Sequence, residues 1–413
     1  VSLLRPNVVR DLDLPRHGLQ ILPLETTFNP LLDGGYLLRG KDPETTYRSI
    51  AKFSRKDAEN APMFSLAMAE VSRLVKPIVD SPAPDPASLK PRELFSLLRL
   101  GRVFKDAGED FVAAQLKMLT MSAVDFLGEW FEAEPLVAAM SASGIIGTFL
   151  GVRSPGTAYV LLHHYMGEID GAFRSWGLSR GGTGAVSNAI AGAARRLGVE
   201  IRTEAPVARI LTKAGRATGV VLENGDEIAA DVVVSSVDPR LTFERFLDGD
   251  RALPDEFMQG VRRYKYRGSS GKVNLALDAL PDFTCLPGRG EHLRGAISIS
   301  PSVDYMERAY DDAKYGRFSR RPYIDIVIPS LTDASVAPAG KHVMSCFVQY
   351  APYHLAEGTW DDQREAFGDA VIDAIAQFAP NIRDVIRHRQ VLTPLDIERT
   401  FGLSEGNIFQ GEL

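Results

Sequence analysis

The chain has 413 residues, of which 45% are hydrophobic and 24% charged, and its formal net charge is −6. This length exceeds the ~100–200 residues of an ordinary domain, so we expect two domains with sizeable cores. The composition excludes a disordered or collagen-like chain. The acidic balance argues against a nucleic-acid partner, because phosphate recognition needs a basic face.

The cysteines and histidines are too scattered for a disulfide framework or a metal site. Cys285 and Cys346 lie far apart and outside any CxxC pattern, so a reducing, cytoplasmic location fits them best. His163 and His164 are adjacent, and neighbours on one helix point about 100° apart, so they cannot both bind one ion. The sequence therefore predicts no metal centre.

The first half of the chain predicts strands and then a long helical block. Residues 18–40 have an extended pattern with a turn at Asp33-Gly34. Apolar residues at helical spacing follow from Pro43 to about Gly177, interrupted by the proline-rich stretch 80–91. Within this block the uncharged run 135–152 is shorter and less apolar than the ~20 residues of a membrane span. We expect a buried helix beside a large pocket there.

The middle of the chain contains glycines that imitate a dinucleotide-binding fingerprint, in RGGTGAVS (180–187). In a true fingerprint a buried strand leads directly into the glycines. Here the preceding residues are charged and glycine-containing, and the sixth position is Ser187, so this is not the Rossmann phosphate turn.

A helix, a ribbon and a strand are predicted after these glycines. The helix covers 185–197 and a strand covers 199–204. A hairpin ribbon follows, with turns at Ala214-Gly215 and Asn224-Gly225. The β-branched run ADVVVSS (230–236) predicts a fully buried parallel strand.

The last part of the chain predicts a sheet and one long helix. Strands dominate residues 257–355, and an amphipathic helix is predicted over 360–379. The final residues, ending in LSEGNIFQGEL, are rich in turn formers.

This order of a glycine turn, helix, strand, ribbon and strand ending in small residues resembles the glutathione-reductase-type flavoproteins. The phytoene desaturase/amine oxidase branch is the most similar, through RGGTGAVSNAI, GVVLENGDEI, VVSSVDP, KVNLALDALPDF and TPLDIERTFGLSEGNIFQGEL. The resemblance implies an α/β (α+β mixed) fold. It divides the chain into a partial FAD-binding domain (1–17, 178–248 and 390–413) and a substrate domain (18–177 and 249–389). The substrate domain would carry a helical lid, 43–177, over a mixed sheet, 257–355.

The resemblance also implies which residues bind FAD. They are Gly181, Gly182, Val207, Ser235, Ser236, Gly406, Asn407, Phe409 and Gly411. Small residues suit such contacts, because a backbone approaches a diphosphate closely only without bulk. The 406–411 cluster could equally be a surface turn. The family's strand–GxGxxG–helix unit would precede Val1, and its flavin-closing segment would follow Leu413. The resemblance therefore implies a portion of a longer protein, with FAD expected for the full-length protein and possibly absent from this chain.

Lys272 is the candidate catalytic residue. Amine-oxidase-like flavoenzymes often have a lysine at the start of the comparable strand, where it holds a water at flavin N5; the alternative is an ordinary lysine at a strand end. The function implied is an FAD-dependent oxidoreductase that moves a hydride between an apolar or amine substrate and flavin N5. A non-catalytic scaffold or binding protein with the same fold is the alternative, and an NAD(P)-linked reductase is a third.

The partners expected are therefore a small, hydrophobic molecule and no nucleic acid. The uncharged content of the helical lid also suggests a substrate drawn from a membrane, and hence a peripheral membrane contact. The sequence leaves the oligomeric state open.

Overall fold

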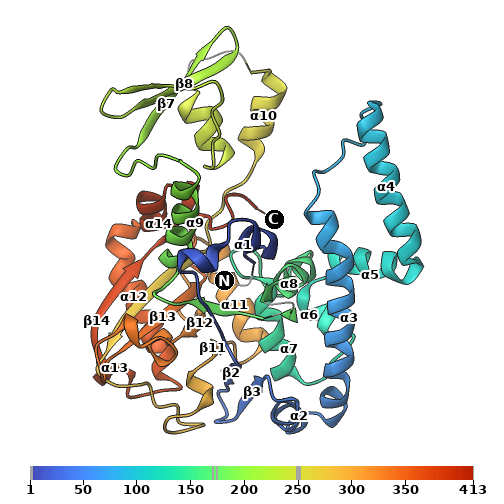
Figure 1. The fold of residues 1–413 in the computed structure, drawn as a ribbon. Helices are drawn as coiled ribbons and strands as arrows, with labels where there is room; N and C mark the ends of the chain where they lie inside the picture. Colours follow the sequence, from blue (N-terminus) through green and yellow to red (C-terminus); the bar gives the residue numbers. More distant parts are fainter. Residues whose placement is uncertain (1–2, 170–171, 174, 248–252, 413) are drawn as a thin grey trace.

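The computed structural model describes residues 3–169, 172–173, 175–247 and 253–412. The chain forms a mixed α/β fold, as predicted. A large sheet lies at the centre, a helical block stands beside it, and a small three-stranded sheet projects at one end (Figure 1).

The large sheet has seven strands in the order β14-β10-β13-β12-β11-β2-β3. All neighbouring pairs are antiparallel except β11 and β2, which are parallel, so the sheet is mixed as predicted. The strands are β2 (Thr26–Pro30), β3 (Tyr36–Gly40), β10 (Ser270–Leu277), β11 (Ala296–Ile299), β12 (Tyr323–Val327), β13 (His342–Gln349) and β14 (Ile386–Leu392).

The two faces of this sheet differ in polarity. One cross-strand row is apolar and buried throughout: Val391, Val273, Cys346, Ile326, Ile297 and Phe28. Helix α12 (Trp360–Ala376) covers this face, with Phe367 against Gly271. The side-chain period of a strand is two, so the next row points the other way. That row carries Leu392, Lys272, Phe347, Asp325 and Ser298, and it contains the charged groups of the sheet centre.

The helical block begins at Pro43 as predicted but ends at Tyr165. It contains α2 (Pro43–Ala51), α3 (Arg55–Val79), α4 (Pro91–Ala107), α5 (Glu109–Thr120), α6 (Ala123–Gly128), α7 (Glu134–Ser141), the short turn η2 (Ala142–Gly144) and α8 (Thr157–Tyr165). The proline-rich stretch near residue 85 separates α3 from α4, as predicted. The expectation of helix up to Gly177 was wrong. The chain instead forms a short hairpin, β4 (Glu168–Ile169) with β5 (Ala172–Phe173), and then β6 (Gly177–Ser179).

The N-terminal residues pack against the helix that follows the glycine turn. Helices α1 (Pro6–Asp11) and η1 (Leu14–His17) lead into β1 (Ile21–Pro23), which pairs with β6. Leu14 and Leu19 form a small core with Ala189 and Ala193 of α9 (Gly184–Arg196). The N-terminus is thereby fixed to the middle of the chain rather than to the large sheet.

The predicted hairpin ribbon is present, but the strands predicted on either side of it are not. The ribbon consists of β7 (Val207–Lys213), β8 (Arg216–Leu222) and β9 (Glu227–Ala229). Residues 199–204 and 230–236 form no ladder with any described residue, although both were expected to be strands. Val232 and Val234 are 74% and 87% exposed, so the expected burial of this run was also wrong. A β-branched run becomes a strand only where a neighbouring backbone supplies hydrogen-bond partners.

The remaining elements are η3 (Leu241–Phe246), α10 (Asp255–Arg263), η4 (Glu291–Leu293), α11 (Val303–Lys314), η5 (Pro329–Leu331), η6 (Ala334–Val336), α13 (Ile382–Val385), α14 (Pro394–Phe401) and η7 (Ser404–Gly406). They lie around the large sheet, except η3, which contacts β7, and α10, which lies in the projecting part (Figure 1). Among the described residues, no helix is both long and apolar enough to cross a membrane.

Candidate functional site

Lys272 lies near the start of β10, on the polar face of the large sheet. Phe347 of β13 and Leu392 of β14 are its cross-strand neighbours. Val273, the next residue, is fully buried on the opposite face, whereas the Lys272 side chain is exposed. Desolvation by the surrounding chain nevertheless lowers the pKa of Lys272, and Cys346 opposes this only weakly. The ammonium group of Lys272 is thus partly desolvated by the protein, but it remains accessible to a ligand.

Asp325 is a second ionisable group on the same face. It is the cross-strand neighbour of Phe347, which separates it from Lys272. Burial raises the pKa of Asp325 to about 7, and a hydrogen bond with Tyr323 partly opposes the shift. The sequence reasoning missed Asp325. The signal was present in YIDIVIPS, where one acid interrupts an apolar strand at a position that alternation assigns to a single face.

The predicted residues of the C-terminal loop form an ordered structure around Asn407. This side chain is 2% exposed. Its Oδ1 accepts hydrogen bonds from the backbone N–H groups of Phe409, at 2.8 Å, and Gly411, at 3.2 Å. Its Nδ2 donates to the carbonyl oxygen of Arg267 at 3.2 Å. Asn407 therefore fixes the loop against the segment that leads into β10 and Lys272.

The same junction requires a glycine at position 268. A Cβ atom at Gly268 would overlap the carbonyl oxygen of Glu405. The backbones of the two segments consequently approach more closely than any other residue type would allow. This contact places the 404–412 loop directly beside the start of the sheet.

A small cavity of about 40 Å³ lies between this loop and the base of the helical block. Phe409 and Asn407 line it on one side, and the backbone of residues 147–150 lines it on the other. Gln349 at the end of β13 holds that backbone: its Nε2 donates to the carbonyl oxygens of Ile145 and Thr148, and its Oε1 accepts from Gly147 N–H at 2.8 Å. The expected buried segment beside a cavity is therefore present, but this cavity is smaller than the large pocket that was predicted.

Ser235 and Ser236 come just before a segment that contacts the same loop. Both are exposed, and the Ser235 Oγ lies 2.7 Å from the Thr242 Oγ1. Asp238 joins this segment to the C-terminal loop, because its carboxylate accepts hydrogen bonds from the N–H groups of Leu241 and Ser404. Arg240 adds an ion pair with Glu405 at 2.9 Å. Asp238 and Arg240 therefore join this segment to the 404–412 loop, which contacts the segment before β10.

The hydrogen bonds and strand pairings described for Gly181, Gly182 and Val207 do not involve this group. Val207 begins β7 and pairs with Leu222. Gly181 and Gly182 adopt left-handed conformations, with φ of 77° and 89°, just before α9. The N–H of Gly181 donates to the Asp333 carboxylate at 2.6 Å, so the chain's own acid already occupies this amide. Their part in cofactor binding stays a prediction.

Comparison with known proteins agrees with this architecture. A family model described as flavin-containing amine oxidoreductase matches residues 105–391. Pyridine nucleotide-disulfide oxidoreductase domain-containing protein 2 of Rattus norvegicus is 37% identical over 437 residues, covering 100% of this chain and 75% of the relative. The zeta-carotene-forming phytoene desaturase of Myxococcus xanthus is 29% identical over 232 residues, covering 56% of this chain and 42% of the relative. Among solved structures, an oxidoreductase from Methanosarcina mazei has a TM-score of 0.56 at 15% identity, covering 94% of this chain and 73% of that one.

The fold and the matched family thus define an FAD-dependent oxidoreductase. The chain belongs to the flavin-containing amine oxidoreductase family. This confirms the predicted enzyme class and cofactor.

The described residues fit the ring end of FAD better than the rest of it. Lys272 is open on the sheet face, and the Asn407 loop is closely packed against the segment before β10, at Arg267 and Gly268; the stretch from this loop to Lys272 is called the ledge below. Such a ledge suits a flat, partly apolar ring that carries polar edges. At the glycine turn, by contrast, Asp333 places a carboxylate where a phosphate would need a free amide. Lys272 and the loop around Asn407 are thus the candidates for holding the flavin, and their role stays a prediction.

Proposed function

We propose that this protein oxidises a small apolar or amine substrate at the ledge formed by Lys272 and the Asn407 loop. FAD supplies the redox chemistry when it is bound, by accepting a hydride at N5. The observation that carries the proposal is the exposed, partly desolvated ammonium group of Lys272 at the junction of β10, β13 and β14.

Lys272 has two tasks in this proposal. Its ammonium group has three donors and holds a water in place beside the reacting atoms. Its positive charge also stabilises negative charge that develops next to it, and the effect is strong because the surroundings are partly dehydrated. Both tasks depend on the charged form, so the lowered pKa limits the range of pH in which Lys272 acts.

The proposed substrate is hydrophobic. The segment 135–152, which forms α7, η2 and the following loop, is uncharged and largely buried against the sheet. A wall of this kind offers apolar contacts and few hydrogen bonds, which favours a ligand with few polar groups. The phytoene desaturase relative, by its name, acts on a carotene precursor, which supports a hydrophobic substrate here by analogy.

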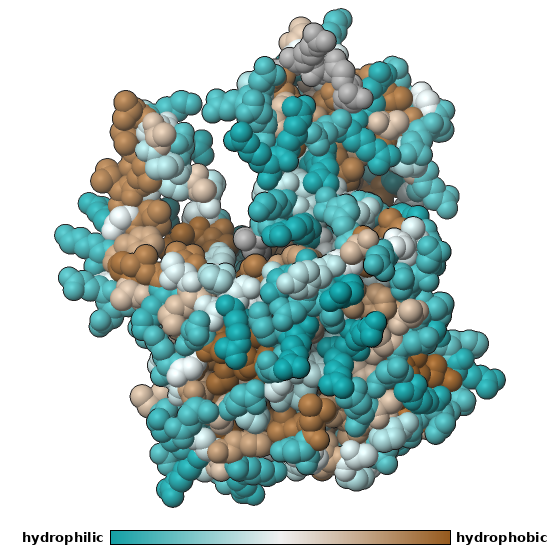
Figure 2. All heavy atoms as spheres, turned by 180° about the vertical axis from the view of Figure 1, so that it is seen from behind, coloured by the Kyte–Doolittle hydropathy of each residue, from teal (hydrophilic) through white to brown (hydrophobic). Residues whose placement is uncertain are grey.

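The proposal includes a peripheral membrane contact through α4. This 17-residue helix has no buried residue, and its Phe95 and Leu98 are 71% and 70% exposed. Arg99 and Arg102 are on the same helix, so it offers apolar side chains beside positive charge, a combination that suits an anionic lipid surface. Figure 2 shows hydrophobic residues gathered on the projecting helical arm, at the upper left.

We also propose the division into an FAD-binding part (1–17, 178–248 and 390–413) and a substrate part. The shared core of Leu14, Leu19 and α9 supports the grouping of the N-terminus with the segment after residue 178. The contacts of Asp238 and Arg240 with residues 404 and 405 support the grouping of that segment with the C-terminal loop.

The test is anaerobic reduction of the flavin in the full-length, FAD-loaded protein, using panels of polyenes, fatty-acyl compounds and amines. Bleaching of the flavin absorption by an apolar or amine compound, at a rate that falls in Lys272→Met, is the expected result. Bleaching by hydrophilic compounds alone would overturn the substrate class. An unchanged rate in Lys272→Met would overturn the role of Lys272.

A further inference from the structure

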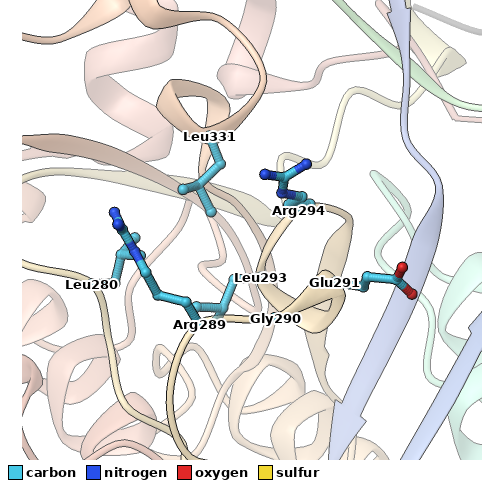
Figure 3. A pocket seen from close by; sticks show the side chains of 7 residues that line it. All are labelled: Leu280, Arg289, Gly290, Glu291, Leu293, Arg294 and Leu331. Atoms are coloured by element: carbon cyan, nitrogen blue, oxygen red, sulfur yellow. The ribbon is translucent and has the colours of Figure 1, made fainter.

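A second, larger cavity lies at the opposite end of β10 from Lys272. It has a volume of about 390 Å³, and Leu280, Arg289, Glu291, Leu293, Arg294 and Leu331 contribute to its lining (Figure 3). Leu277, the last residue of β10, is five residues from Lys272, or about 17 Å at ~3.4 Å per residue. The cavity follows that end of the strand, so it is separate from the proposed flavin ledge.

Two guanidinium groups give this cavity a positive charge. Arg289 and Arg294 form no ion pair with any acid in the described part of the chain. In Figure 3 they lie on either side of Leu331, while the Glu291 carboxylate points away from both. Arginine remains charged at every relevant pH, so the charge of this pocket is permanent.

The imidazole of His342, which lies next to Arg289, does not offset this positive charge. The Nη2 of Arg289 lies 3.4 Å from the Nε2 of His342, and the Nδ1 of His342 lies 3.2 Å from the Ser330 hydroxyl. Burial and the adjacent Arg289 both lower the pKa of His342, so the imidazole is neutral near pH 7. Neutral His342 can accept a hydrogen bond from Arg289 and help to fix it, but it contributes no negative charge.

Three leucines give the cavity an apolar part, and the turn beside them is held in place. Leu293 is buried, Leu280 comes from the loop after β10, and Leu331 is the last residue of η5. The turn that carries both arginines is fixed by the Thr26 hydroxyl, which donates to the Glu291 carbonyl oxygen at 2.8 Å, and by Asp282, which accepts from Gly288 N–H at 2.7 Å. The arginines therefore project from an ordered frame.

We propose that this cavity binds an organic oxyanion, a carboxylate or phosphate group attached to an apolar chain. The planar, multi-donor guanidinium matches both oxyanions, and bonds from it to an anion are the strong class of hydrogen bond. Leu280, Leu293 and Leu331 accept the apolar part. A volume of about 390 Å³ lies within the usual ~300–1,000 Å³ of small-molecule sites.

The test is calorimetric titration of the full-length protein with octanoate, octyl phosphate, inorganic phosphate and octylamine. Saturable binding of octanoate or octyl phosphate is expected, with affinity at least about tenfold lower in Arg289→Ala/Arg294→Ala, since two charge-assisted contacts are lost. Arg308→Ala, which removes an exposed arginine of α11, is the matched control and should bind like the unchanged protein. Because Arg289 and Arg294 are exposed, the double variant should fold, as checked by its circular dichroism and unfolding midpoint.

Three results would overturn the proposal. The first is the absence of saturable binding by both octyl anions at millimolar concentration. The second is binding that Arg289→Ala/Arg294→Ala leaves unchanged while that variant is folded. The third is binding of inorganic phosphate or octylamine as tight as that of octyl phosphate, which would remove the apolar or the anionic part of the recognition. None of these results bears on flavin reduction at Lys272.

Discussion

The Asp333 carboxylate accepts a 2.6 Å hydrogen bond from the backbone N–H of Gly181, across 152 residues of sequence. The other carboxylate oxygen accepts from the N–H and hydroxyl groups of Ser335. This acid holds the turn before α9 against the loop that follows β12. A glycine pair that resembles a phosphate-binding turn is thus tied down by the protein itself.

The first prediction concerns the pH dependence of this link. The Gly181 N–H, followed by Ser335, lowers the pKa of Asp333 from 3.8 to about 2. A depressed carboxyl pKa contributes stability that is complete above pH 3.8 and is lost as the pH falls through about 2. Asp333→Asn should therefore lower the urea midpoint at pH 7, and the difference from the unchanged protein should shrink toward pH 2. An equal difference at both pH values would contradict this assignment.

The second prediction concerns Lys272. Lys272→Met keeps the length and most of the apolar stem but removes the charge and the donors. We expect substrate-driven flavin reduction to slow by about 10²–10³-fold, as for the loss of one preorganised donor. Stopped-flow absorption of the FAD-loaded protein measures the rate, with flavin content as the check on binding. Lys341→Met, which removes an exposed lysine paired with Asp278, is the control and should leave the rate unchanged.

The third prediction concerns Asp325. Burial raises its pKa from 3.8 to about 7, so the folded protein holds this proton more tightly than the unfolded chain does. The resulting stabilisation is complete below pH 3.8 and is lost as the pH rises through about 7. The difference corresponds to at most about 4 kcal/mol. Asp325→Asn should thus gain stability relative to the unchanged protein between pH 5 and pH 8, measured by urea unfolding. A constant difference over that range would refute the shift.

The fourth prediction concerns the junction of Gly268 and Glu405. Gly268→Ala forces the two backbones apart and should lower the free energy of unfolding by about 1–3 kcal/mol, as overpacking does. Gly101→Ala is the matched control, because a Cβ there meets nothing within 4 Å and the residue lies inside α4. That change should stabilise the protein by about 0.5–1 kcal/mol. If both substitutions acted in the same direction, the close approach would not be the cause.

The fifth prediction concerns the exposed face of α4. Phe95→Glu/Leu98→Glu should reduce sedimentation of the protein with vesicles of anionic phospholipid by at least about tenfold, because it removes apolar contacts and adds repulsion. Leu197→Glu replaces a leucine of equal exposure outside the arm and serves as the control. Vesicle binding that responds equally to both changes would rule out α4 as the contact.

The sequence predicted elements whose structure depends on their own local pattern, and it did not predict features that depend on residues distant in the chain. The strand pattern of residues 257–355 predicted part of the sheet, including β10 and β13, and α12 was predicted over 360–379 and ends at Ala376. The strand predicted over residues 230–236 is absent because a β-branched pattern forms a strand only where neighbouring strands pair with it. Asp325 was missed because its importance depends on cross-strand register, which brings together residues far apart in sequence.

The three hydrogen bonds of Gln349 have a consequence for the entry of substrate. They anchor residues 145–148 to the end of β13, so the base of the helical block moves only as the sheet moves. Helix α4, which has no buried residue, has no such anchor among the described contacts. Helices α3 and α5 also have residues in the buried core, so any opening of the block is expected at α4 while residues 145–148 stay in place. A substrate would therefore enter beside α4, while residues 145–148 keep their position against the end of β13.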